Sequence, residues 1–318
     1  MSTYTGSGPY CYANSLAMAL GPAAPPVAVV ETLTGSAFGA QLPGGGLPFF
    51  DPYGWDPEQG LDAAVELLGL GCVRTADGSA AEAAARLRAA CAVGPVLVGP
   101  VDLGLLPYRP GTPARGEGDH YVVVLDLVDG VVLLHDPEGH PYATSPLAAF
   151  TEAWRAETVE YTDVPFVMRS GFTRRREVTV ERALRRSLPR AAEWLSGRGG
   201  GRPSPPGSLG GAAAVEALAE LVGTGLDPAV REHLAGFAVR VGARRLADAA
   251  HCLGLLRLPE AAAEAARQAR LLGGLQHPLV TGDDAALAAG LRLLAPGYER
   301  LRGRLLSAVA AGADGTPG

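Results

Sequence analysis

The chain has 318 residues, of which 47% are hydrophobic, so its length favours two domains and its composition allows each a packed core. It has no run of about 18 uncharged apolar residues, and its first residues lack the basic-then-apolar pattern of a signal peptide. These features argue against membrane spanning and export, so we expect a cytoplasmic protein. The net charge of −6 argues against nucleic acid as the main partner.

The four cysteines are far apart in the sequence and include no Cys-x-x-Cys pair, which argues against a zinc site and a disulfide framework. One of them, Cys11, follows a loop of small residues that begins at Thr5. Pro9 keeps the approach extended, apolar residues recur at helical spacing from Ala13 to Leu20, and Gly21 ends the pattern, so Cys11 should lie at a helix start.

A cysteine at a helix start is favoured as a thiolate, because the partial positive charge there lowers the pKa of the thiol. The same amides can hold an oxyanion. The competing interpretation is that Cys11 is a small buried hydrophobic residue. We favour a nucleophile, because the glycine-rich approach and a suitable histidine further along the chain accompany it.

A turn-rich segment from Gly35 to Gly60 carries aromatic side chains where a polar loop would be expected. Two interpretations stay open: the segment covers hydrophobic core, or it walls an acyl or aromatic pocket. The candidate pocket residues are Tyr10, Phe38, Gln41, Phe49, Phe50, Tyr53 and Trp55.

The next segments predict helices at 61–70 and, after a Ser79 cap, at 80–92, followed by a buried strand at 95–101. A hairpin then runs from Asp119 to Pro137, because Asp129-Gly130 separates two runs of branched apolar residues. His120 opens its first strand and Asp136 ends its second.

The loop register decides whether His120 and Asp136 meet. A two-residue turn would place Asp136 opposite Val123, on the other face from His120, whereas a three-residue loop would place it opposite Val122, on the His120 face. We predict the three-residue loop, with the pair as diagonal neighbours. His135 and His140 are the competing histidines; His135 should point to the opposite face, and His140 lacks an obvious orienting partner.

The rest of the chain predicts a helix at 147–156 and an edge strand at 159–168 that contains Pro165. From residue 178 onward the pattern is helical, with a mobile glycine-, proline- and serine-rich linker at 196–211. Between Arg169 and Arg202 there are ten arginines and three glutamates. This stretch is either a solvated helix face or a docking surface for an acidic partner.

The order of cysteine, histidine and acidic residue is that of papain-like thiol enzymes. The segments 9–16, 47–55, 118–124 and 135–137 resemble the N-terminal domain family of butirosin biosynthesis protein H, and more remotely the double-glycine leader peptidases of bacteriocin exporters. The resemblance covers about residues 5–168. It implies an α+β fold, with N-terminal helices and an antiparallel sheet in a papain-like catalytic domain at 1–170. The helical pattern of the later sequence predicts an all-α domain at 171–318.

The resemblance also implies roles: Cys11 as nucleophile, His120 as base and Asp136 as the residue that orients the base. Papain-like enzymes place a glutamine oxyanion donor about six residues before the cysteine, where this chain has Thr5. We therefore expect the Cys11 amide to act with another donor, Thr5 or Asn14.

The implied activity is cysteine-dependent acyl transfer in secondary-metabolite biosynthesis, from a carrier-protein thioester to a small-molecule amine. The donor would arrive on the phosphopantetheine arm of an acyl carrier protein, and we expect no metal and no bound cofactor. A peptidase or amidase on the same triad, and a non-catalytic binding module, are the alternatives. Thr5 in place of glutamine favours the binding module.

Overall fold

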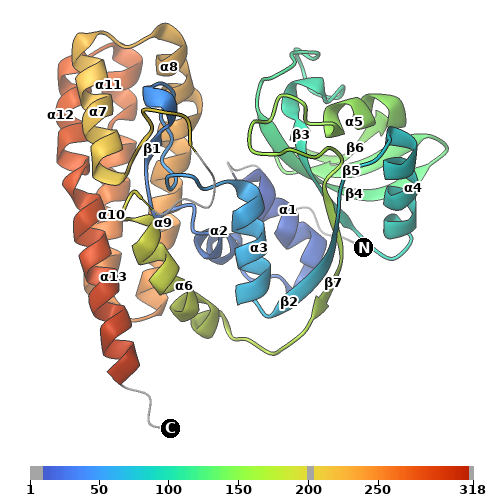
Figure 1. The fold of residues 1–318 in the computed structure, drawn as a ribbon, viewed down its shortest axis with the longest axis horizontal. Coiled ribbons are helices and arrows are strands. Elements are labelled where there is room, and N and C mark those ends of the chain that lie inside the picture. The colour runs from blue at the N-terminus through green and yellow to red at the C-terminus, as the bar shows by residue number, and fades with distance from the viewer. Residues whose placement is uncertain (1–9, 199–203, 315–318) are drawn as a thin grey trace. The chain divides into compact units, whose positions relative to one another are not determined.

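The computed structural model describes residues 10–198 and 204–314 (Figure 1). Thr5 and part of the predicted linker therefore lie outside the described residues. The chain is a mixed α+β protein with two compact units. The first comprises Met1–Val30 and Gly69–Glu177, and the second comprises Glu31–Leu68 and Val178–Gly318.

This division differs from the expected one at 170/171 in two ways: the first unit extends to Glu177, and residues 31–68 are not part of it. That segment belongs to the helical unit, and helix α2 (Val27–Thr34) passes from one unit to the other. Helix α3 (Pro57–Leu67) contacts α6 (Val180–Trp194), far along the sequence. Two separate segments of the chain thus form the second unit, and local composition does not predict that the first of them belongs there.

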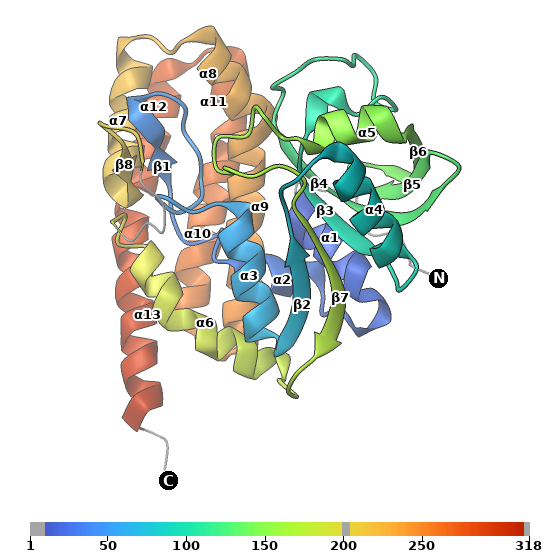
Figure 2. The same cartoon turned by 45° about the vertical axis from the view of Figure 1, so that its right-hand side comes forward.

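A six-stranded antiparallel sheet forms the centre of the first unit, in the order β2-β7-β3-β4-β5-β6. Figure 2 shows β2 and β7 side by side at one edge. The strand bounds are β2 Leu70–Thr75, β3 Val96–Asp102, β4 Asp119–Val128, β5 Val131–Asp136, β6 His140–Pro146 and β7 Met168–Arg174.

Helices cover both faces of this sheet. The branched residues of β3, β4 and β5 form a core with α4 (Ala80–Cys91) and α5 (Leu147–Trp154) on one face. Helix α1 (Cys11–Leu20) packs against β4 on the other face, where Ser15 Oγ donates to the carbonyl oxygen of Tyr121 at 3.1 Å. This contact positions the start of α1 relative to the start of β4.

The β4–β5 hairpin forms as predicted, but the loop prediction was wrong. Val128 pairs with Val131, so the turn has two residues, and Asp129 and Gly130 both have the positive φ that such a turn requires. A β-bulge between Val124 and Asp126 then shifts the register by one residue. The pairing Val123↔His135 places the next residue, Asp136, opposite Val122 after all. The bulge, and not a longer loop, places Asp136 opposite Val122.

The strand expected at 159–168 is also wrong. Most of those residues form turns, and the strand begins only at Met168, between β2 and β3 rather than at an edge. Strands β2 and β6 were not predicted, because neither has a strongly apolar sequence; much of each is exposed or half-buried.

The second unit is helical apart from the short pair β1 (Gln41–Leu42) and β8 (Leu209–Gly210). Its longer helices run side by side in Figure 1, and α9 packs closely on α10 and α7 on α12. Their bounds are α7 Gly211–Thr224, α8 Pro228–His233, α9 Val239–Leu255, α10 Pro259–Gly274, α11 Gln276–Thr281, α12 Asp284–Leu294 and α13 Pro296–Asp314.

A buried ion cluster lies inside the second unit. Arg245 Nε lies 3.0 Å from Glu31 Oε1, and its Nη1 lies 3.0 Å from Asp51 Oδ2. Ser36 Oγ donates to the same oxygen of Glu31, and Gln41 Nε2 donates to the other oxygen of Asp51. Because the guanidinium stays charged, this cluster fixes the 31–68 segment onto α9 with permanent charges.

Candidate active site

Cys11 is the first residue of α1, as predicted, and Tyr10 precedes it as the N-cap residue. Helix geometry leaves the first amide groups without acceptors inside the helix. No acidic residue occupies the first turn. The half-buried thiol therefore sits in the positive end of the helix dipole.

His120 and Asp136 meet through their side chains. His120 Nε2 lies 2.7 Å from Asp136 Oδ1, and the two side chains are 2% and 0% exposed. The thiol of Cys11 lies close enough to the same imidazole for each group to shift the pKa of the other. The structure thus brings all three predicted residues to one place.

Two further groups hold Asp136 in place. The amide of Glu138 donates to Oδ1 at 2.8 Å, and the hydroxyl of Tyr108 donates to Oδ2 at 3.1 Å. Tyr108 was missed in the sequence, because the proline-rich loop that carries it shows no periodic pattern. Its neighbour Arg109 pairs with Glu138 at 3.3 Å, which ties the same loop to the end of β5.

The three ionisable groups shift one another's pKa values. Burial acts to lower the pKa of His120, but the charge and hydrogen bond of Asp136, together with Cys11, raise it well above its ordinary value. Burial likewise acts to raise the pKa of Asp136, and His120 keeps it below its ordinary value. Asp136 is therefore a carboxylate that favours the imidazolium form of His120.

The pKa of Cys11 is raised, whereas the sequence predicted that it would be lowered. Burial raises the pKa of the thiol, although the hydrogen bond and charge of His120 act to lower it. The expected lowering by the helix dipole is outweighed, because the sulfur is more enclosed than a loop position implied. The shifts therefore favour the protonated forms of both the thiol and the imidazole, and the two groups titrate as a coupled pair.

A second carboxylate lies near the thiol. Asp119, directly before His120, carries a negative charge that acts to raise the pKa of Cys11. Its Oδ2 accepts a hydrogen bond of 2.7 Å from the Tyr161 hydroxyl, which also lies 3.2 Å from the hydroxyl of Tyr121. Sequence reasoning missed this network, because Tyr161 comes from a segment that we expected to be a strand.

The remaining polar candidates have different placements. Asn14 is buried one turn after Cys11, and Thr5 lies outside the described residues. His135 is buried, and its Nδ1 accepts from the Tyr142 amide at 3.1 Å. The ring of His140 lies 5.5 Å from that of Tyr108.

The candidate pocket residues divide between the two units. Tyr10 belongs to the first unit with Cys11, whereas Phe38, Gln41, Phe49, Phe50, Tyr53 and Trp55 belong to the second. Phe38, Phe50 and Trp55 are buried there; Phe50 packs on Gly242, and Trp55 on Gly60. Phe50 thus covers hydrophobic core, as in the first interpretation, whereas the buried Phe38 and Trp55 also line a cavity of the second unit, as in the second interpretation.

Comparison with known proteins gives two matches. Residues 205–306 match the family model of the YobF C-terminal domain. The chain is also 32% identical over 164 residues to the uncharacterized protein YobF of Bacillus subtilis, an alignment that covers 51% of this chain and 53% of that protein. The aligned part thus spans about half the length of this relative. No helix within the described ranges has the length and apolarity that a membrane span needs.

Proposed function

We propose that the first unit is a papain-like cysteine acyltransferase that takes an acyl group from a carrier-protein thioester and passes it to an amine. The single observation that carries this proposal is the buried 2.7 Å contact of His120 Nε2 with Asp136 Oδ1, beside a Cys11 thiol that lies close enough to the imidazole to affect its pKa. Nucleophile, base and orienting group stand in the order that nucleophilic acyl transfer needs.

In the first half-reaction the Cys11 sulfur attacks the thioester carbonyl carbon, the bond to the carrier sulfur breaks, and the proton held by the Cys11–His120 pair goes to the departing thiolate. The first-turn amide of Cys11 supports the oxyanion, and Asn14 stays a candidate second donor. In the second half-reaction the amine attacks the acyl-enzyme, His120 takes its proton, and the Cys11 sulfur leaves. The product is an amide, and Cys11 recovers its thiol.

The charge around the thiol supports an amine acceptor over water. Asp119 and Glu138 both act on Cys11 as negative charges. Such charges disfavour a thiolate, but they attract a protonated amine to the same place. Asp119 is held by Tyr161, so its carboxylate has a fixed position for this purpose.

The carrier protein and its phosphopantetheine arm remain part of the proposal. Helix α6 buries one face and exposes the arginines of the other, including Arg182, Arg185 and Arg190. Two of these pair with glutamates of the same helix, at 3.1 Å for Arg185 and 2.6 Å for Arg190. The exposed face still presents guanidinium groups that suit acidic side chains or a phosphodiester.

Intact-protein mass spectrometry after mixing with acyl thioesters tests the proposal. We expect the wild-type chain to gain one acyl mass and to lose it when an amine is added, with amide as product. The Cys11→Ala variant should gain none, and Cys72→Ala should behave as the wild type. Equal labelling of Cys11→Ala contradicts the proposal, free acid with or without amine indicates a hydrolase, and an unlabelled wild type indicates a binding module.

A further inference from the structure

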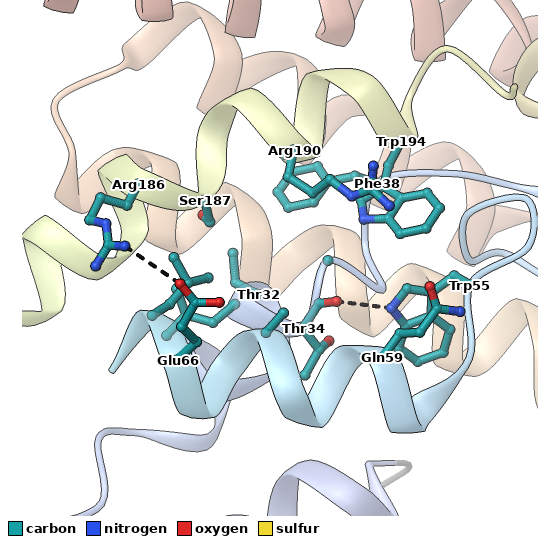
Figure 3. A pocket seen from close by; sticks show the side chains of 15 residues that line it. Thr32, Thr34, Phe38, Trp55, Gln59, Glu66, Arg186, Ser187, Arg190 and Trp194 are labelled. Carbon is teal, nitrogen blue, oxygen red and sulfur yellow. Dashed lines mark hydrogen bonds and ion pairs between the residues drawn. The ribbon is translucent and has the colours of Figure 1, made fainter. Parts of the chain in front are cut away.

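The second unit contains a partly open cavity of about 280 Å³, close to the small end of the range for ligand sites. Figure 3 shows α6 on one side of it, carrying Arg186, Arg190 and Trp194, and α3 on the other, carrying Gln59 and Glu66. Phe38, Trp55 and Trp194 give the cavity three aromatic walls. All its lining residues belong to the second unit, so the cavity is separate from the Cys11 site.

The two tryptophans of this cavity each carry an indole N–H group. Trp55 Nε1 donates to the Thr34 carbonyl oxygen at 2.9 Å. Trp194 is only 4% exposed, and its indole lines the cavity. An indole N–H in a cavity wall can donate to an acceptor that enters the cavity.

Gly35 packs against the same indole. It has a φ of +84°, and a Cβ atom placed on it would lie 3.0 Å from Trp194 Nε1 and 3.1 Å from its Cδ1. Any side chain at this position would therefore crowd the indole. The left-handed φ also disfavours other residue types there.

A cation stands next to the same indole. The guanidinium of Arg190 lies 4.0 Å from the centre of the Trp194 ring and 2.6 Å from Glu193. Arg186 lines the cavity farther along α6, 3.9 Å from Glu66. The donors at the Trp194 end are thus an indole N–H and a guanidinium, which together suit a carboxylate, while the walls suit a flat ring.

We infer that this cavity binds an aromatic carboxylate, with the ring against the aromatic walls and the carboxylate accepting from Trp194 Nε1 and Arg190. The inference goes beyond the proposed acyl transfer and does not depend on it, because no residue of the first unit contributes to the cavity.

Isothermal titration calorimetry of the full chain with 2-naphthoate tests the inference. We expect saturable binding, reduced at least about tenfold in Trp194→Phe, which keeps the aromatic wall and removes the donor. Trp55→Phe, whose N–H is already bonded within the protein, should bind within about threefold of the wild type. No binding to the wild type, or equal binding to Trp194→Phe, overturns the inference.

Arg190→Gln is a second test that does not depend on the buried tryptophan. We expect it to weaken 2-naphthoate binding at least about threefold, whereas Arg182→Gln, on the same helix but outside the cavity, should leave it unchanged. The uncharged 2-naphthamide should bind the wild type at least about tenfold more weakly than the carboxylate, and equal binding of the two contradicts recognition of the carboxylate. Cys11→Ala should bind 2-naphthoate normally, so failure of acyl transfer and failure of this site are separable.

Discussion

The two units each bury a charged cluster, but from different groups. In the second unit Arg245 lies between Glu31 and Asp51, at 3.0 Å from each. In the first unit Asp136 holds His120, whose pKa is also raised by the neighbouring Cys11. Burial is similar in the two places, since His120 is 2% exposed and Arg245 is 4% exposed.

The two clusters differ in whether their cationic group can lose a proton. A guanidinium stays protonated at any relevant pH, so the Arg245 cluster can hold segments together but cannot transfer a proton. The imidazole of His120 can gain and lose a proton, and it lies beside the thiol of Cys11. A buried charge is therefore evidence for chemistry only when its partner titrates and a reactive atom lies within reach.

We expect the largest effect, on reaction rate, from a substitution in the cluster of Cys11, His120 and Asp136. Asp136→Ala removes the group that orients His120, so we expect the rate of Cys11 acylation by a thioester to fall about 10⁴-fold. Asp126→Ala removes an exposed carboxylate from the same hairpin and should leave the rate unchanged. Stopped-flow acylation measures both. A loss of less than about tenfold in Asp136→Ala would show that His120 needs no orienting group.

A substitution in the Arg245 cluster should instead change the stability of the fold. Arg245→Met leaves Glu31 and Asp51 buried without their cation, and we expect the free energy of unfolding to fall by about 3–5 kcal/mol. Urea titration measures it. Arg244→Met, which breaks the pair of an exposed arginine with the half-buried Asp248, should cost less than about 1 kcal/mol. An equal loss in the two variants would contradict the structural role of Arg245.

Tyr108→Phe tests a smaller contribution to the first cluster, a single hydrogen bond to Asp136. It removes one hydrogen bond to Asp136 Oδ2 and leaves the bonds from His120 and Glu138 in place. We expect the acylation rate to fall about threefold to tenfold, as for loss of one hydrogen bond. Tyr142→Phe, whose ring lies against His135, is the matched control. Unchanged acylation rates in both variants would show that Tyr108 does not contribute to the reaction.

The smallest expected effect is a change of stability with pH. The raised pKa of His120 stabilises the fold fully below its ordinary value of 6.5, and that contribution is lost as the pH rises through the folded-state value. The lowered pKa of Asp136 stabilises the fold above its ordinary value of 3.8, and that contribution is lost as the pH falls.

The difference in unfolding free energy between wild type and Asp136→Ala should therefore be largest between these two ordinary values and shrink toward alkaline pH. Urea titrations at a series of pH values measure it. A difference that grows from pH 6 to pH 8 would contradict the direction of the His120 shift.

The sequence was sufficient where the signal was local. The helix that starts at Cys11 and the hairpin that carries His120 and Asp136 follow from glycine, proline and branched residues alone. The β-bulge near Leu125 has no such signal, so the loop prediction failed although Asp136 reached the expected place.

Contacts over long sequence distances escaped prediction. Tyr108 and Tyr161 reach the site from irregular segments, and the return of residues 31–68 to the helical unit depends on partners such as Arg245. The pKa of Cys11 was misjudged for the same reason, because burial depends on the whole unit rather than on a helix start.

The most direct test of the account is the rate at which Cys11 reacts with iodoacetamide across pH, compared in wild type and His120→Ala. Because burial raises the pKa of the thiol and His120 acts to lower it, we predict a wild-type rate that rises above neutral pH and a variant curve displaced to higher pH. Peptide mapping separates Cys11 from Cys72 and Cys91. Superimposable curves for the two proteins would contradict activation of Cys11 by His120.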